Sequence, residues 1–270
     1  MSKLIDRFRI KPGAKVDLSS IDPAFTGKLK SKQEADDRLE KNIARLNKLQ
    51  YRLAAENRRA LLIILQAMDA GGKDGTIRHV MTGLNPQGCR VTPFKVPAGE
   101  ETRHDFLWRI HRAVPGFGEI GIFNRSQYED VLVVRIHDLV PKAVWSARYD
   151  QINDFEKTLS GNRMRILKFF LHISSEEQKA RLEARVNDPE KRWKISEADL
   201  AERKYWNDYM RAYEDVLRKC STKDAPWFVI PSNHKWFRNL AVSEIIADTL
   251  EDMNPTAPKA SIDLSKVSFK

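Results

Sequence analysis

Two features that define small secreted domains and zinc-binding proteins are missing from this sequence. It has only two cysteines, Cys89 and Cys220, in 270 residues. Two thiols cannot form a disulfide framework, and they cannot complete a tetrahedral zinc site without other ligands. The six histidines are scattered along the chain without metal-ligand spacing. We therefore expect two unpaired thiols in a reducing compartment.

Long hydrophobic runs are also missing. The N-terminal residues contain no apolar stretch of the kind found in a secretory signal. The longest purely aliphatic run is Leu61–Leu65, which is much shorter than a membrane span. Hydrophobic residues make up 41% of the chain and charged residues 31%, an ordinary composition for a folded protein. We expect a soluble, cytoplasmic protein with no membrane partner.

Positive charge is the one compositional excess. Lys and Arg number 47 against 37 Asp and Glu, which gives a net charge of +10. A surplus of this size favours polyanionic partners: nucleic acid, an anionic membrane or phosphate-rich small molecules. No zinc-finger pattern, RNA-binding aromatic motif or isolated basic helix accompanies the surplus. We therefore expect no nucleic-acid partner.

Strand-like and helix-like segments alternate along the chain. Residues 1–58 read as an N-terminal arm, extended up to residue 30, and a helix from 31 to 58. Residues 59–253 read as one α/β domain and 254–270 as a C-terminal tail that follows the surface. Strands are expected at 61–65, 90–95, 119–123, 166–173 and 227–231, and helices near 74 and at 100–113, 142–160, 175–187, 197–219 and 236–253. This alternation predicts an α/β fold, with a parallel sheet of about five strands flanked by helices.

The first apolar strand leads directly into the glycine-rich segment Gln66–Thr76. A strand, a tight glycine turn and a helix start are the context of a phosphate loop, in which Lys73 would supply a point charge. The strict pattern is not met, because Ala67 replaces the first glycine and Asp74 the Ser or Thr. Asp69 would repel phosphate unless a bridging Mg²⁺ lay between them. The alternative is an ordinary glycine-rich turn with a solvated lysine.

A second polar segment follows the third expected strand. Ligands of doubly wound sheets lie beyond the carboxyl ends of strands, so Asn124 and Arg125 should face the same crevice as Lys73. An Asn-Arg pair suggests that this segment clamps an anion rather than activates water. The alternative is an arginine that pairs with Glu129 or Asp130 at the surface.

A third segment is rich in arginine and lysine. Arg181 and Arg185 are four residues apart, which places them on one face of a helix. Lys191 and Lys194 follow after a break at Pro189. Together these residues would form a mobile lid that closes over phosphates. The alternative is a solvated helix end held by salt bridges.

These three segments together resemble a known family. Ala67–Thr76, Phe123–Val134 and Arg181–Lys194 are similar to the variant Walker A motif, the Walker-B-like motif and the lid of the polyphosphate kinase 2 family. The resemblance implies a P-loop kinase fold similar to thymidylate kinase, with a helical lid at about 181–199. It also implies phosphoryl transfer between inorganic polyphosphate and ADP or ATP, and possible use of AMP, with Mg²⁺ or Mn²⁺ as the cofactor.

The resemblance further implies roles for individual residues. Catalytic roles fall to Asp69, Lys73 and Arg125, and Asp69 would also hold the metal. Phosphate or nucleotide binding is implied for Ala70, Gly71, Gly72, Asp74, Gly75, Asn124 and Glu129. Lid or polyphosphate contacts are implied for Arg181, Arg185, Lys191, Lys194 and Asp199. Glu129 resembles the subgroup that phosphorylates both AMP and ADP, whereas other members carry Asn there.

Other functions stay open at this point. An ATP-dependent nucleotide or nucleoside kinase on the same fold would use the same loop with a different donor. A nucleic-acid-binding protein and a non-catalytic scaffold are further alternatives, and the phosphate loop argues against the scaffold. We expect a homo-oligomer.

Overall fold

The computed structural model describes residues 3–29, 31–263, 265 and 267–268. Its helices are α1 Lys3–Phe8, α2 Lys32–Glu56, α3 Lys73–Val80, α4 Trp108–Ala113, α5 Val133–Ile136, α6 Lys142–Gly161, α7 Ser175–Asn187, α8 Glu197–Glu202, α9 Trp206–Cys220 and α10 Lys235–Met253. Its strands are β1 Ala60–Gln66, β2 Cys89–Pro93, β3 Ile120–Asn124, β4 Met164–His172 and β5 Trp227–Pro231. Short 3-10 turns are η1 Leu18–Ser20, η2 Pro86–Gly88, η3 Gly99–Arg103, η4 Gln127–Val131, η5 Arg192–Lys194 and η6 Arg203–Tyr205.

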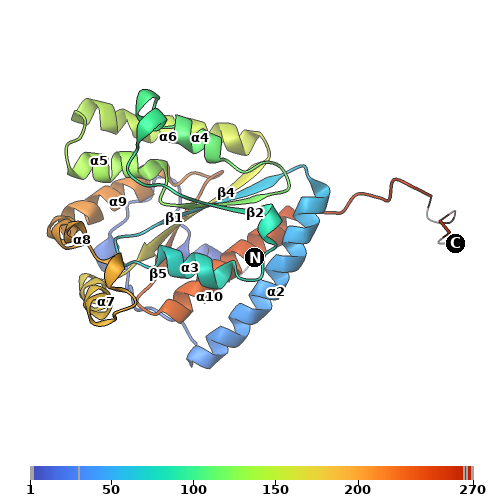
Figure 1. Cartoon of the computed structure of the whole chain (residues 1–270), viewed down its shortest axis with the longest axis horizontal. Coiled ribbons are helices and arrows are strands. Elements are labelled where there is room, and N and C mark those ends of the chain that lie inside the picture. The colour runs from blue at the N-terminus through green and yellow to red at the C-terminus, as the bar shows by residue number, and fades with distance from the viewer. Residues whose placement is uncertain (1–2, 30, 264, 266, 269–270) are drawn as a thin grey trace.

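The five strands form one parallel sheet in the order β2-β3-β1-β4-β5 (Figure 1). The central strand β1 is buried along its whole length. Successive side chains of a strand point to opposite faces of the sheet. Leu62 and Ile64 therefore enter one hydrophobic cluster, and Leu61, Ile63 and Leu65 enter the other. Burial on both faces explains why the run is continuously apolar.

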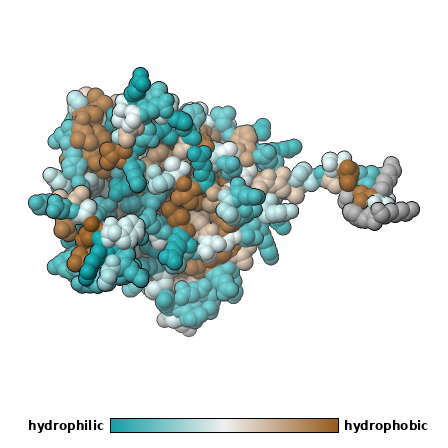
Figure 2. All heavy atoms as spheres, in the orientation of Figure 1, coloured by the Kyte–Doolittle hydropathy of each residue, from teal (hydrophilic) through white to brown (hydrophobic). Residues whose placement is uncertain are grey.

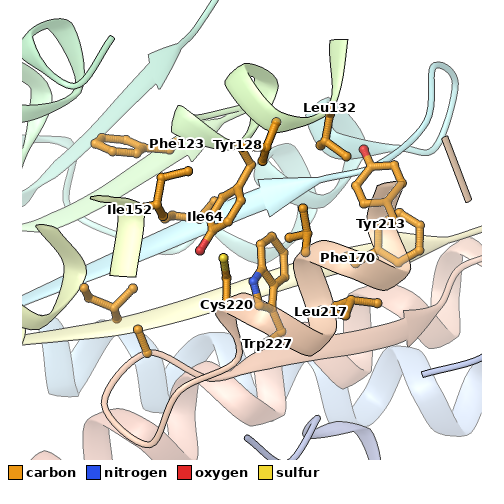
Figure 3. Packing of buried hydrophobic residues seen from close by; sticks show 14 of the residues in the cluster. Ile64, Phe123, Tyr128, Leu132, Ile152, Phe170, Tyr213, Leu217, Cys220 and Trp227 are labelled. Carbon is orange, nitrogen blue, oxygen red and sulfur yellow. The ribbon is translucent and has the colours of Figure 1, made fainter. Parts of the chain in front are cut away.

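Helices cover both faces of this sheet, as the sequence predicts. α4, α6 and α9 pack on one face, and α1, α2, α3 and α10 pack on the other (Figure 1). Figure 3 shows part of the first cluster, where the rings of Tyr128 and Trp227 pack edge to face with their centroids 4.8 Å apart. The sheet and its two helical layers form the predicted P-loop kinase fold.

The expectation of an extended arm up to residue 30 is wrong for residues 3–8. Residues 3–8 form the helix α1, which buries Ile5 and Phe8 in the cluster beneath α10. Further along, Leu18 is buried in the opposite cluster. The backbone N–H of Ile10 donates to the carbonyl oxygen of Trp227 at 2.9 Å. Apolar side chains at wide spacing therefore anchor this segment across the edge strand β5.

Two predicted helices are interrupted in the structure. The segment 100–113 divides into η3 and α4, because the Asp105 side chain accepts a hydrogen bond from the backbone N–H of Leu107 at 2.9 Å and forms a local turn. The segment 197–219 divides into α8, η6 and α9. At this second break Arg203 donates to Gln178 of α7 at 2.7 Å, which ties the turn to another helix.

The C-terminal tail does not pack on the rest of the protein, unlike the N-terminal segment. Residues 256–263 of the tail are exposed and lead away from the body instead of following its surface as expected (Figure 1). No apolar side chain after Pro255 is buried among the described tail residues.

Most of the face in Figure 2 is hydrophilic. Within the described ranges, no helix has the length and apolar character needed to cross a membrane.

Candidate active site

The loop between β1 and α3 is a tight turn at the carboxyl edge of the sheet. Ala70 and Gly72 both have positive φ, at 59° and 102°, and Gly72 is the N-cap of the eight-residue helix α3. A Cβ atom on Gly71 would lie 2.8 Å from the carbonyl oxygen of Met68, so the turn has no room for a side chain there. The loop thus combines a glycine turn with a helix N-terminus, the arrangement that binds anions.

Lys73 folds back onto this loop. Its Nζ donates to the carbonyl oxygens of Ala67 at 2.9 Å and Met68 at 3.4 Å. Burial, followed by the positive charge of Arg125, lowers the pKa of Lys73 to about 8. The lysine is therefore held in place at the loop and is not the solvated lysine of the alternative interpretation.

Arg125 joins the phosphate loop to the segment after β3. Its Nη2 lies 2.7 Å from Oδ1 of Asp69, and its Nη1 lies 2.9 Å from Oε2 of Glu129. The Glu129 carboxylate is the main cause that raises the pKa of Arg125 above its ordinary value. Beside this cluster, Asn124 Nδ2 donates to Oδ1 of Asp74 at 2.7 Å. The pairing with Glu129 that the alternative foresaw is present, but it lies beside the phosphate loop and includes Asp69.

The turn η4 that carries Glu129 is anchored in the core. Gln127 and Tyr128 donate to Oε1 of Glu156 at 2.9 and 2.8 Å. Lys168 pairs with the same carboxylate and donates to the Tyr128 hydroxyl at 2.8 Å. All four side chains are at most 1% exposed. This buried network fixes the position of the segment that holds Arg125. No local pattern in the sequence predicts it, because its members come from different elements.

Arg181 is buried at the base of the lid, so it is not the solvated helix end of the alternative interpretation. Its Nε lies 2.7 Å from Oε1 of Glu177, and its Nη1 donates to the carbonyl oxygen of Ala70 at 3.0 Å. Its Nη2 donates to the carbonyl oxygens of Ser232 and Asn233, at 3.1 Å for Asn233. One guanidinium therefore connects α7, the phosphate loop and the segment after β5.

The rest of the predicted lid is more exposed. Arg185 is half-buried, and Lys191 and Lys194 are exposed. Arg185 Nη1 donates to the carbonyl oxygen of Lys194 at 3.4 Å. Asp199 Oδ2 accepts a hydrogen bond from the backbone N–H of Ser196 at 2.8 Å, so its carboxylate caps α8. Arg185, Lys191 and Lys194 are therefore less constrained by packing than Arg181.

A cleft of about 1270 Å³ brings these groups together. It contains every predicted site residue except Glu129, which contacts the site through Arg125. Five acidic side chains line it, and the basic side chains that line it are Lys32, Lys73, Lys95, Arg125, Arg181, Arg185, Lys191, Lys194, Lys235 and Arg238. A cleft with twice as many cations as anions suits ligands with several phosphates.

Comparison with known proteins agrees with this geometry. A sequence profile described as polyphosphate kinase 2 matches residues 29–258. The chain belongs to the polyphosphate kinase 2 family. It is 48% identical to an AMP/ADP-polyphosphate phosphotransferase of Meiothermus ruber, over 97% of this chain and 98% of that protein. It is 46% identical to an ADP-polyphosphate phosphotransferase of Rhodopseudomonas palustris, over 94% and 92%.

A solved structure of the family is also similar along nearly its whole length. The polyphosphate kinase 2 of Arthrobacter aurescens TC1 superposes with a TM-score of 0.91 at 45% identity, over 95% of this chain and 92% of that one. The resemblance inferred from the three sequence motifs is thereby confirmed.

The carboxylates of the loop fit a magnesium ion. Mg²⁺ usually takes one or two protein carboxylates and completes its shell with substrate phosphates and water. Asp69 accepts a hydrogen bond from Arg125 through Oδ1, and Asp74 accepts one from Asn124 through Oδ1. Each carboxylate has a second oxygen. Among the described residues, no group of three or more His, Cys, Asp or Glu could hold a metal. The donor set therefore fits an ion whose coordination the substrate completes.

Sequence reasoning in this polyphosphate kinase 2 chain missed three residues near the loop. Gln178 Nε2 donates to the carbonyl oxygen of Asp69 at 3.0 Å. Arg238 and Lys235 line the cleft from the first turns of α10. α10 begins beyond the carboxyl end of β5, so the strand-end rule that identified Asn124 also applied there.

Proposed function

We propose that the chain transfers the terminal phosphoryl group of inorganic polyphosphate to ADP, reversibly and with Mg²⁺. The phosphate loop at the head of a cationic cleft is the observation that supports it best. Two relatives that cover nearly the whole chain are named polyphosphate phosphotransferases. An ATP-dependent nucleotide kinase would use the same loop, but its substrates carry fewer phosphates than a polyphosphate chain, which suits a cleft lined by ten cations better.

The proposed chemistry requires positioning and charge neutralisation more than a base. The terminal phosphate of ADP is already anionic, so it attacks without deprotonation. Its oxygen forms a bond to the terminal phosphorus of polyphosphate while the bridging P–O bond breaks. The electron pair remains on the shortened polyphosphate chain. Mg²⁺, when bound, neutralises phosphate charge between the two polyanions.

Specific residues divide the remaining work. Lys73 and the loop N–H groups hold oxygens of the transferred phosphoryl group. Arg125 clamps the terminal phosphate of the nucleotide and is itself held by Asp69 and Glu129. The lid residue Arg185 adds charge when the lid closes.

AMP is a second acceptor in this proposal. The carboxylate of Glu129 lies next to the nucleotide clamp Arg125. It can hold a water or a second ion in the space left by the missing phosphate of AMP. Product analysis with AMP as sole acceptor tests this point, and AMP left unchanged beside converted ADP contradicts it.

The deciding experiment for the main activity uses purified chain, polyphosphate, ADP and Mg²⁺. We expect ATP to form, as measured by luminescence, and to form at least about 100-fold more slowly with Lys73→Ala prepared in the same way. That variant excludes a contaminating kinase. A wild-type chain that uses ATP but not polyphosphate as donor would instead be an ordinary nucleotide kinase. Mn²⁺ in place of Mg²⁺ tests the identity of the ion.

A cytoplasmic location and assembly into a homo-oligomer complete the proposal. Sedimentation of the purified chain measures the assembly, and a monomer at all concentrations contradicts it.

A further inference from the structure

Arg238 is a buried cation without a carboxylate partner. It is 2% exposed and lies in the first turns of α10. Its Nε and Nη2 both donate to the neutral side chain of Asn239, at 3.1 and 2.8 Å. No Asp or Glu forms an ion pair with it in the part of the chain that the structure describes. Burial, followed by the charge of Arg181, lowers the pKa of Arg238 to about 10. A buried charge of this kind is costly unless an anion compensates it.

The guanidinium lies directly against the phosphate loop. Its Nη1 lies so close to Gly72 that a Cβ atom on Gly72 would overlap it, and Nη1 of Arg181 lies 3.6 Å from the same Cβ position. Its Nη2 lies 3.2 Å from the corresponding point on Gly75. Two arginines therefore converge on the amino end of α3, where the helix dipole also favours negative charge.

A third cation faces the same place. Lys235 is exposed at the start of α10 and lines the cleft. Burial, followed by the charges of Arg181 and other neighbours including Arg238, lowers the pKa of Lys235. The acidic side chain in this group is Glu177, and it is already paired with Arg181 at 2.7 Å. The cluster keeps a net positive charge.

The strand order separates this cluster from the nucleotide clamp. Arg125 follows β3, which lies on one side of β1, whereas Arg181 and Arg238 belong to helices that follow β4 and β5 on the other side. The phosphate loop after β1 lies between them. A nucleotide held by Arg125 lies on the β3 side of the phosphate loop. The α10 side of the loop is therefore open to the other substrate.

We propose that Arg238, Arg181 and Lys235 form a second phosphate subsite, which holds a unit of the polyphosphate chain behind the phosphoryl group at Lys73. The inference rests on the proposed function. The subsite gives the polyphosphate chain a direction. From the phosphoryl group at Lys73 the chain runs past the start of α10 toward Lys32 of α2, which also lines the cleft.

The test compares Arg238→Met, Arg238→Lys and Lys235→Ala with the wild type. The matched control is Arg38→Met, which removes a positive charge paired with Glu244 of α10, away from the residues that line the cleft. We expect Arg238→Met to raise the KM for long-chain polyphosphate by about tenfold or more, as the loss of a charge-assisted hydrogen bond does. The KM for ADP should stay within about twofold of the wild-type value.

A binding measurement separates this subsite from the activity itself. Tripolyphosphate alone, without nucleotide, should raise the melting temperature of the wild type and of Arg38→Met, and raise that of Arg238→Met much less. Lys235→Ala alters an exposed residue, so it reports on the subsite even where Arg238→Met does not fold. Wild-type protein that binds tripolyphosphate in this way but forms no ATP contradicts the proposed function and supports the subsite.

Equal increases in both KM values, or an unchanged KM for polyphosphate in Arg238→Met and Lys235→Ala, overturn the proposal. Full rescue of the polyphosphate KM by Arg238→Lys supports it, because a structural role through Asn239 requires the guanidinium geometry.

Discussion

At the scale of single residues, Lys73 is the most direct test of the phosphate loop. It is expected to stabilise charge on the transferred phosphoryl group, and removal of one such donor typically lowers kcat by about 100-fold or more. Lys73→Ala should show that loss in steady-state assays, with the free energy of unfolding within about 1 kcal/mol of wild type. Lys142→Ala, an exposed lysine of α6, is the control. Near wild-type turnover in a folded Lys73→Ala protein would falsify the assignment.

The lowered pKa of Lys73 predicts a pH dependence. Its ammonium is lost as pH rises through about 8, so the KM for polyphosphate should increase above that pH. Lys73→Arg keeps its charge and should lack this increase. The unfolded chain keeps the ordinary value of 10.5, so it binds more protons between the two values, and the contribution of Lys73 to the free energy of unfolding rises with pH there. A wild-type KM that is flat across this range contradicts the prediction.

Asp69 is expected to serve both the metal and Arg125. Asp69→Asn keeps the size of the side chain but removes a charge that pairs with Arg125 at 2.7 Å. Activity should fall, and the Mg²⁺ concentration needed for half-maximal activity should rise, because Mg²⁺ prefers charged oxygen ligands. The measurement is a Mg²⁺ titration at fixed polyphosphate and ADP. A titration curve that superposes on that of the wild type leaves no metal role for Asp69.

At the scale of elements, α7 contains one arginine with a structural role, Arg181, and one whose expected role is in substrate binding, Arg185. Arg181 is buried and connects three segments, so Arg181→Ala leaves Glu177 and several carbonyl groups without a partner and should cost about 1–3 kcal/mol of stability. Arg185 is half-buried, and Arg185→Ala should change stability by no more than about 0.5 kcal/mol while activity falls. Chemical denaturation measures the stability of both variants, and steady-state assays measure their activity. Equal stability losses would place Arg185 in the packed base of the lid as well.

How much could be predicted from the sequence also depends on the element. β1 and the phosphate loop have strong local signals: a wholly apolar strand followed by a glycine turn. The break in the helix predicted over 197–219 has no such signal, since Arg203 makes its contact with Gln178 of a different helix. Arg238 and the Glu156–Lys168 network depend likewise on tertiary packing, which the spacing of residues along one element does not contain.

At the scale of the whole molecule, the net charge of +10 and the cation-lined cleft both favour the binding of a polyanion. Parallel strands place the loop after β1, the clamp after β3, the lid after β4 and the start of α10 after β5 at one edge of the sheet. Each loop contributes cations to the same cleft. A long polyanion can therefore contact several elements at once, whereas a nucleotide contacts few.

This difference in contact predicts unequal responses to salt. Polyphosphate bound along several cations releases condensed counterions, and affinity then falls steeply as salt concentration rises, as for nucleic acids. The KM for long-chain polyphosphate should rise severalfold between low and moderate salt, while the KM for ADP changes less. The measurement uses saturating co-substrate and fixed free Mg²⁺ at two salt concentrations. Arg238→Met provides an internal comparison. Its cleft has one cation fewer, so its KM for polyphosphate should depend less steeply on salt concentration. Equal responses of the two KM values would mean that the donor contacts no more of the basic cleft than the nucleotide does.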